Sequence, residues 1–158
     1  MAKTILIPID FTVESLNTLK LSLDKHRHEQ IEVLLIYAEQ LSDSITELAF
    51  FSAGKSIQSR ITPVFNDALT ILKNSFESTK LYLRIELFHG YNTNAFIHFA
   101  TSNRVDICYI PETYRLKLKG NAFNPLPIIK KSGIPFQEIA WAASENLSDE
   151  DQLQQLFI

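Results

Sequence analysis

The sequence predicts an α/β domain built on an open, parallel, five-stranded sheet with helices on both faces. Short, continuously apolar segments alternate along the chain with longer segments whose apolar residues recur at helical spacing. Continuous apolar runs are typical of strands that are covered on both faces, as parallel strands are. A chain that alternates strands and helices in this way leads to a parallel sheet with right-handed crossovers.

Length and composition fit one globular domain. The chain has 158 residues, of which 46% are hydrophobic and 21% are charged. A formal net charge of −3 is too weak to favour nucleic acid or an anionic membrane as a partner. The single cysteine, Cys108, excludes an internal disulfide and a cysteine-rich metal site. Every apolar run is shorter than a signal peptide's apolar region or a membrane span requires, so we expect a cytoplasmic protein.

Five apolar runs predict the strands, over residues 4–9, 31–38, 81–88, 105–110 and 135–140. After the first strand, Thr12 is expected to cap a helix whose Leu16, Leu19 and Leu23 share one side and which ends near residues 26–28. Residues 39–59 are long for a connection, and we expect a short helix over 44–51 followed by a loop.

Three further helices are predicted. An apolar stripe over 61–76 indicates a long helix, in which Thr62 and Pro63 form the cap and first turn or Pro63 kinks a helix begun near Ile57. Asn92 or Thr93 caps the next helix. A short helix over 125–131 precedes the last strand.

The predicted domain covers residues 1–140, and residues 141–158 form an acidic tail. Ser148 is placed to cap a final helix that has Leu153, Leu156 and Phe157 on one face. These apolar side chains need cover, either from this domain or from a partner.

The carboxyl ends of the strands predict where a ligand binds. In open parallel sheets ligands lie in the crevice where strand order reverses. Residues 10–12, residues 37–38 and the loop over 111–124 are expected to meet there. The candidate crevice residues are Pro8, Asp10, Thr12, Tyr37, Ala38, Ile110, Pro111, Tyr114, Lys117, Lys119 and Gly120. The alternative is that Asp10 and Thr12 only cap the first helix.

Three stretches resemble the universal stress protein family. The opening ILIPIDFTVESLNTLKLSL resembles the family's first strand, its Pro-x-Asp-x-Ser/Thr turn and the following helix. FHGYNTNAFIHFATSNRVDICYIP resembles the third strand, glycine, helix and fourth strand. IIKKSGIPFQEI resembles the closing helix and strand. The resemblance covers nearly all of residues 3–140. It implies an adenine nucleotide alpha hydrolase-like sheet in the order 3-2-1-4-5 and a homodimer formed through the last strand.

The resemblance also has implications for ATP binding. In family members that bind ATP, the aspartate after the first strand approaches the adenine, and this aspartate corresponds to Asp10. Their phosphates lie against a loop reading Gly-x2-Gly-x9-Gly-Ser/Thr. Counted from the fourth strand, those four positions hold Pro111, Tyr114, Asn124 and Pro125; counted back from the last strand, Ala122 and Phe123 stand in place of Gly-Ser.

The loop chemistry therefore predicts weak or absent ATP binding. Glycine permits a positive φ and a close approach of backbone N–H groups to phosphate, whereas proline removes a donor. Gly120 is the only glycine in the loop. The alternative is that Arg115, Lys117 and Lys119 bind an anion through their side chains.

Other motifs carry less weight. The stretch AFFSAGKS, residues 49–56, fits a relaxed phosphate-loop pattern but does not follow a strand-like segment. The four histidines show no zinc spacing; His26 and His28 are interpreted as the polar end of a helix, and His89 borders the crevice. Asp10 and Glu112 could approach each other across it.

We therefore predict a non-enzymatic stress-response or signalling module that needs neither a cofactor nor a metal and binds a small molecule or a partner protein. The alternative is an adenine-nucleotide-binding protein with weak ATPase activity. A third hypothesis is that the acidic tail lies over the basic loop and regulates access to it.

Overall fold

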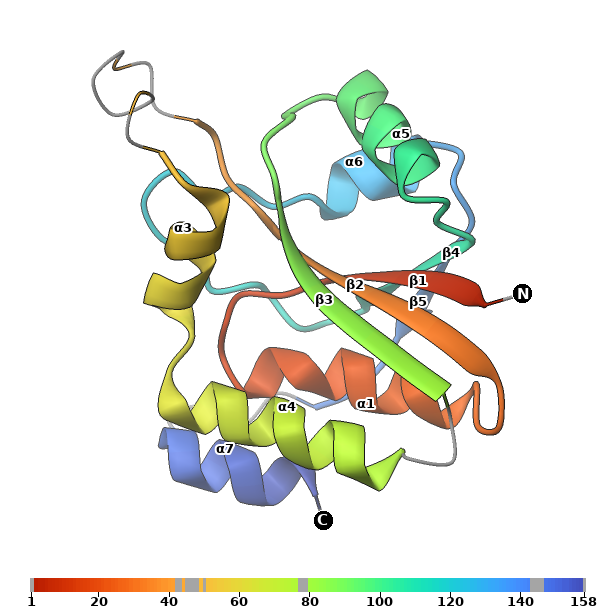
Figure 1. Ribbon diagram of the computed structural model, residues 1–158, viewed down its shortest axis with the longest axis vertical. Coiled ribbons are helices and arrows are strands. Elements are labelled where there is room, and N and C mark those ends of the chain that lie inside the picture. Colours follow the sequence, from red (N-terminus) through yellow and green to blue (C-terminus); the bar gives the residue numbers. More distant parts are fainter. Residues whose placement is uncertain are drawn as a thin grey trace.

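The computed structural model contains one sheet of five parallel strands in the order β3-β2-β1-β4-β5 (Figure 1). It describes residues 2–41, 44, 49, 51–76, 80–142 and 147–157. The predicted fold class and strand order are confirmed. The strands are β1 (Lys3–Pro8), β2 (Gln30–Ala38), β3 (Lys80–Phe88), β4 (Ile107–Pro111) and β5 (Phe136–Ile139).

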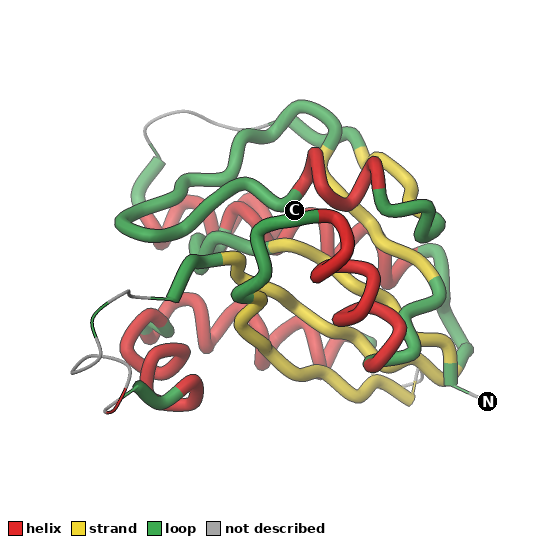
Figure 2. Tube along the Cα trace, turned by 90° about the horizontal axis from the view of Figure 1, so that it is seen from above, coloured by secondary structure: helices red, strands yellow, loops and turns green. Residues whose placement is uncertain are grey.

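Helices cover both faces of this sheet. Helices α1, α4 and α7 lie on one face, and α5 and α6 lie on the other (Figures 1 and 2). A 3-10 turn, η1 (Glu14–Leu16), leads into α1. The helices are α1 (Asn17–Asp24), α3 (Ala53–Arg60), α4 (Pro63–Ser75), α5 (Thr93–Ser102), α6 (Leu126–Lys131) and α7 (Asp149–Leu156). Within the described ranges, no helix is both long and apolar enough to cross a membrane.

The apolar core is divided by the sheet into two layers. Successive side chains of a strand point to opposite faces, so Ile5 and Ile7 pack with α1, α4 and α7, while Leu6 packs with α5 and α6. All three side chains are fully buried. Burial on both faces explains why the strands read as unbroken apolar runs.

Local capping signals fix three of the helix starts. The side chains of Thr62, Asn92 and Ser148 accept hydrogen bonds from the backbone N–H three residues later. The predicted caps at these positions are confirmed. The kinked-helix alternative at Pro63 is wrong, because extended backbone at Ile61 separates α3 from α4.

Two helix predictions need correction. The loop expected up to residue 59 is wrong, because α3 occupies Ala53–Arg60 with Ser52 as its cap. The helix predicted over 44–51 lies largely outside the described residues. The first helix also begins later than expected: Thr12 accepts a hydrogen bond from the Ser15 N–H at the 3-10 turn, and α1 starts at Asn17.

His26 has a different role from the one predicted. It is buried, and its ring bonds to the Tyr109 hydroxyl at 2.7 Å and to the Glu29 carboxylate at 2.7 Å. Tyr109 lies in β4, so the imidazole joins the chain after α1 to that strand of the sheet. A histidine at a helix end gives no indication of such a partner 83 residues away.

The close approach of β3 and α5 requires glycine at position 90. A Cβ at Gly90 would collide with the Ala95 Cβ, whereas one at Gly54 would have no heavy atom within 4 Å. We expect Gly90→Ala to lower the free energy of unfolding by about 1–3 kcal/mol. Gly54→Ala, the matched control in α3, should leave it unchanged or raise it by up to about 1 kcal/mol. Urea unfolding measures both, and equal effects would contradict the packing described.

Candidate functional site

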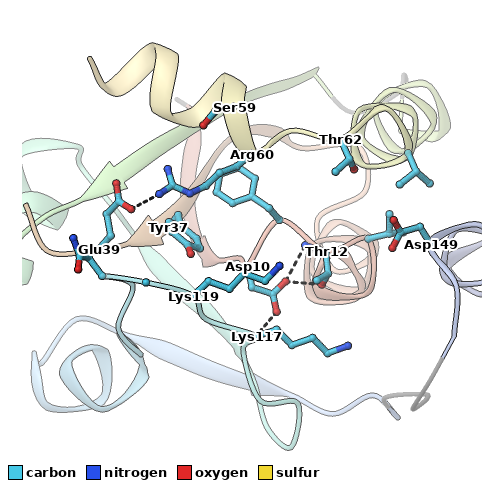
Figure 3. A pocket seen from close by; sticks show the side chains of 15 residues that line it. Asp10, Thr12, Tyr37, Glu39, Ser59, Arg60, Thr62, Lys117, Lys119 and Asp149 are labelled. Carbon is cyan, nitrogen blue, oxygen red and sulfur yellow. Dashed lines mark hydrogen bonds and ion pairs between the residues drawn. The ribbon is translucent and has the colours of Figure 1, made fainter. Parts of the chain in front are cut away.

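A cavity of about 650 Å³ opens at the carboxyl end of the sheet (Figure 3). It lies beside β1, whose neighbours are β2 and β4, so it is at the point where strand order reverses. Segments after β1, β2 and β4 contribute to its wall, as do α3, α4 and α7. The lining residues are Asp10, Phe11, Thr12, Val13, Tyr37, Glu39, Ser59, Arg60, Thr62, Val64, Lys117, Lys119, Gly120, Asn121 and Asp149.

The Asp10 carboxylate is saturated by hydrogen bonds from the protein itself. Its Oδ1 accepts from the Thr12 N–H at 3.0 Å and the Thr12 hydroxyl at 2.5 Å. Its Oδ2 accepts from the Tyr114 hydroxyl at 2.5 Å and the Lys117 N–H at 2.8 Å. A carboxylate has about four acceptor positions, and Asp10 is only 7% exposed. A ligand could bond to this carboxylate only by displacing one of these donors.

These bonds make Asp10 a clasp between the turn after β1 and the loop after β4. The Tyr114 ring stacks on Trp141, with ring centroids 4.6 Å apart. The Trp141 indole N–H donates to the Thr18 hydroxyl in α1 at 2.9 Å. The loop is therefore held at Asp10 by hydrogen bonds and at Trp141 by stacking, so the clasp is anchored to α1 as well.

The turn after β1 is strained where it enters the cavity. Phe11 has a φ of 63°, a left-handed conformation that a bulky residue rarely adopts. Its ring packs against Tyr37 at 5.0 Å and Phe65 at 5.6 Å between centroids. This aromatic packing offsets the strain and holds Asp10 at the carboxyl end of the sheet.

The Tyr114 hydroxyl stays protonated to high pH. Burial, and then the adjacent Asp10 carboxylate, raise the pKa of Tyr114 above its ordinary value of 10.0. The unfolded chain therefore loses this proton first, so the free energy of unfolding falls as pH rises above about 10. We expect Tyr114→Phe to flatten that alkaline decline, as measured by urea unfolding from about pH 8 to pH 11. Tyr82, whose side chain is exposed, supplies the control Tyr82→Phe, and equal slopes in both variants would contradict the expectation.

Several backbone N–H groups of the loop after β4 already donate hydrogen bonds within the protein. This loop pairs with the end of β2 and the chain that follows: the Gln40 N–H donates to the Asn121 carbonyl, and the Phe123 N–H donates to the Ala38 carbonyl. The Ala122 N–H donates to the Lys119 carbonyl, and the Lys117 N–H donates to Asp10. These N–H groups are not free to hold a phosphate.

An ion pair forms the wall of the cavity on the α3 side. The Arg60 guanidinium contacts the Glu39 carboxylate at 2.5 Å and lies 5.0 Å from the centre of the Tyr37 ring. Burial raises the pKa of Tyr37; Arg60 opposes that rise and Glu39 adds to it. The His89 Nδ1 bonds to the Glu39 carbonyl at 3.1 Å, so the histidine predicted to border the crevice supports its wall.

The structure brings together part of the predicted site. Asp10, Thr12, Tyr37, Lys117, Lys119 and Gly120 line the cavity. The remaining predicted residues, which are Pro8, Ala38, Ile110, Pro111 and Tyr114, are buried and do not line it. Arg115 and Glu112 are exposed and do not line it.

Sequence reasoning missed the contributions of α3, α4 and α7. Arg60 ends α3, Thr62 caps α4 and Asp149 begins α7. None of them directly follows a strand, so the rule for strand ends does not find them. Glu39 directly follows Ala38 and could have been included by that rule. Lys55 and Ser56 of the phosphate-loop-like stretch lie inside α3 and not at the end of a strand. Within the described part of the chain, no group of three or more His, Cys, Asp or Glu side chains could hold a metal ion.

No protein-family model matches the sequence, and no curated protein matches it. The structure, in contrast, is similar to several solved ones. Hypothetical protein PH0823 aligns with a TM-score of 0.53 and 15% identity, over 91% of this chain and 100% of that one. Hypothetical protein MJ0577, the subject of a structure-based assignment of biochemical function, gives 0.53 and 19% over 91% and 99%.

A named universal stress protein aligns equally well. Universal stress protein UspA from Lactobacillus plantarum gives a TM-score of 0.53 and 11% identity, over 87% of this chain and 96% of that one. At such identities the likeness shows the fold and nothing finer. The fold that the sequence resemblance implies is thus confirmed: the chain has the fold of universal stress protein UspA.

Proposed function

We propose that this chain is a non-enzymatic, universal-stress-type signalling module that binds a small ligand or a partner protein in the crevice beside Asp10. We also propose that it does not hold ATP in the way that the sequence resemblance implies for the ATP-binding members of the family. The cytoplasm is its proposed location, and no cofactor is assigned to it. The observation that carries the proposal is the saturated Asp10 carboxylate, which accepts four hydrogen bonds from Thr12, Tyr114 and Lys117.

Two physical arguments support this proposal. An adenine that approached Asp10 would have to displace a buried donor, and a buried donor left unpaired costs about 1–3 kcal/mol. A triphosphate would need main-chain N–H groups at the turn after β4, where Pro111 has none and the Lys117 N–H is already bonded to Asp10. Both the adenine and the triphosphate of ATP therefore lack free hydrogen-bonding partners at these positions.

The second candidate function is adenine-nucleotide binding with weak ATPase activity. The cavity volume of about 650 Å³ and the two lysines on its wall favour it, because lysine side chains can hold phosphate as point charges.

Calorimetry with ATP and Mg²⁺ separates the two functions. We expect no binding at micromolar nucleotide in the native chain. Micromolar affinity in the native chain that is lost in Asp10→Ala would overturn the proposal in favour of the nucleotide-binding function. Lys119→Gln is a second variant that leaves the clasp intact, and loss of micromolar affinity in it would have the same meaning.

The homodimer remains part of the proposal. Strand β5 is at the edge of the sheet, and Phe136 at its start is 41% exposed. An uncovered edge strand can pair with another chain, and the sequence resemblance implies pairing through this strand. Light scattering at micromolar concentration is expected to give twice the mass of the chain, and a strict monomer would remove the dimer from the proposal.

A further inference from the structure

The charged side chains around the cavity balance one another. Three are acidic and three are basic, in a space of about 650 Å³: Asp10, Glu39, Asp149, Arg60, Lys117 and Lys119. A wall of this kind exerts no net attraction on a polyanion. It suits a ligand that is neutral overall.

Most of these charges are already engaged. Arg60 is paired with Glu39 at 2.5 Å, and Lys117 contacts Glu14 at 3.5 Å. Asp10 accepts its four hydrogen bonds from neutral donors. Among the described residues, no hydrogen bond or ion pair is recorded for the side chains of Lys119 and Asp149. One positive and one negative group therefore remain to meet a ligand.

These two groups reach the cavity from different sides. Lys119 belongs to the loop after β4, and Asp149 is the first residue of α7, beyond Thr12 in Figure 3. The wall also includes the aromatic residues Phe11 and Tyr37 and the aliphatic Val64. The cavity thus offers an apolar surface flanked by a cation on one side and an anion on the other.

We propose, building on the ligand-binding function above, that the crevice takes a small zwitterion with an apolar or aromatic body, its anionic group on Lys119 and its cationic group on Asp149. Such a ligand is neutral overall, as the balanced wall requires. Asp149 also repels a polyphosphate, so it acts as a specificity-determining residue that α7 brings to the site.

Three probes that share one aromatic ring test this assignment by calorimetry on the full-length protein. para-Aminoethylbenzoic acid carries its two charges at opposite ends of the ring, phenylethylamine lacks the carboxylate, and para-ethylbenzoic acid lacks the amine. We expect the zwitterion, para-aminoethylbenzoic acid, to bind about two- to fivefold more tightly than either of the others, since each exposed ion pair contributes up to about 1 kcal/mol.

Two charge-removing variants identify the partners. Asp149→Asn should abolish the preference for the zwitterion over para-ethylbenzoic acid, and Lys119→Gln should abolish its preference over phenylethylamine. Glu150→Gln is the matched control, because Glu150 is the next acidic residue of α7 and does not line the cavity.

Each outcome decides the proposal. A preference for the zwitterion that the two variants remove and the control retains supports it. Equal binding of the three probes, binding unaltered by the variants, or no binding of any probe at millimolar concentration overturns the zwitterion assignment. None of these results affects the clasp at Asp10, whereas tight binding of ATP would overturn the proposed function itself.

Discussion

Replacing Asp10 by alanine is expected to lower the free energy of unfolding by about 3 kcal/mol, which is among the larger effects of a single substitution. The side chain is 7% exposed and accepts four hydrogen bonds. Alanine leaves the buried Tyr114 hydroxyl and the Lys117 N–H without this acceptor. Unfolding in urea, followed by circular dichroism, measures the change.

Asp149→Asn is the matched control for this substitution. Asp149 also lines the cavity, but its side chain is exposed and has no recorded hydrogen bond within the described residues. We expect its replacement to change the free energy of unfolding by no more than about 0.5 kcal/mol. If Asp10→Ala cost no more than Asp149→Asn, the carboxylate would not be a clasp.

The second large effect is expected at Leu156. This side chain is fully buried in the core layer shared with α1 and α4, and it anchors α7 to the domain. Leu156→Ala should lower the free energy of unfolding by about 2–4 kcal/mol, through lost burial and the cavity left behind. Differential scanning calorimetry would record this as a lower melting temperature.

Leu153→Ala supplies the comparison within the same helix. Leu153 is only partly buried against the core, so its truncation should cost clearly less than that of Leu156. Equal costs would mean that α7 is not docked as described. The polar contacts of α7 give an independent check: the Glu14 N–H donates to the Gln152 side chain at 3.2 Å, and the Lys20 ammonium donates to the Leu156 carbonyl.

The docking of α7 answers a question that the sequence leaves open. Leu153, Leu156 and Phe157 were expected to need cover from this domain or from a partner. The domain's own core provides it. The helix also brings Asp149 to the cavity that Lys117 and Lys119 line. That the acidic tail lies over the basic loop and regulates access to it stays a prediction.

The sheet and most helix starts could be predicted because their signals are local. Strand runs such as 31–38 are apolar on both faces, and a cap such as Thr62 bonds to an N–H only three residues away. Helix α3 could not be found in this way. It has no buried residue and contains Gly54, so no apolar stripe marks it and its propensity is low.

The candidate site was predictable to the extent that strand ends determine it. Asp10 and Lys117 follow β1 and β4, Tyr37 lies at the end of β2, and the structure brings all three to one cavity. The clasp itself joins Asp10 to Tyr114, which are 104 residues apart. Such a pairing depends on tertiary packing, as does the arrival of Arg60 and Asp149, and no local pattern encodes either.

Amide hydrogen exchange at Lys117 tests the central claim most directly. If the Asp10 carboxylate holds this N–H at 2.8 Å, its exchange is slow in the native protein, unchanged by ATP with Mg²⁺, and fast in Asp10→Ala. A Lys117 amide that exchanges freely in the native chain, or one that stays protected when the carboxylate is removed, would contradict the account.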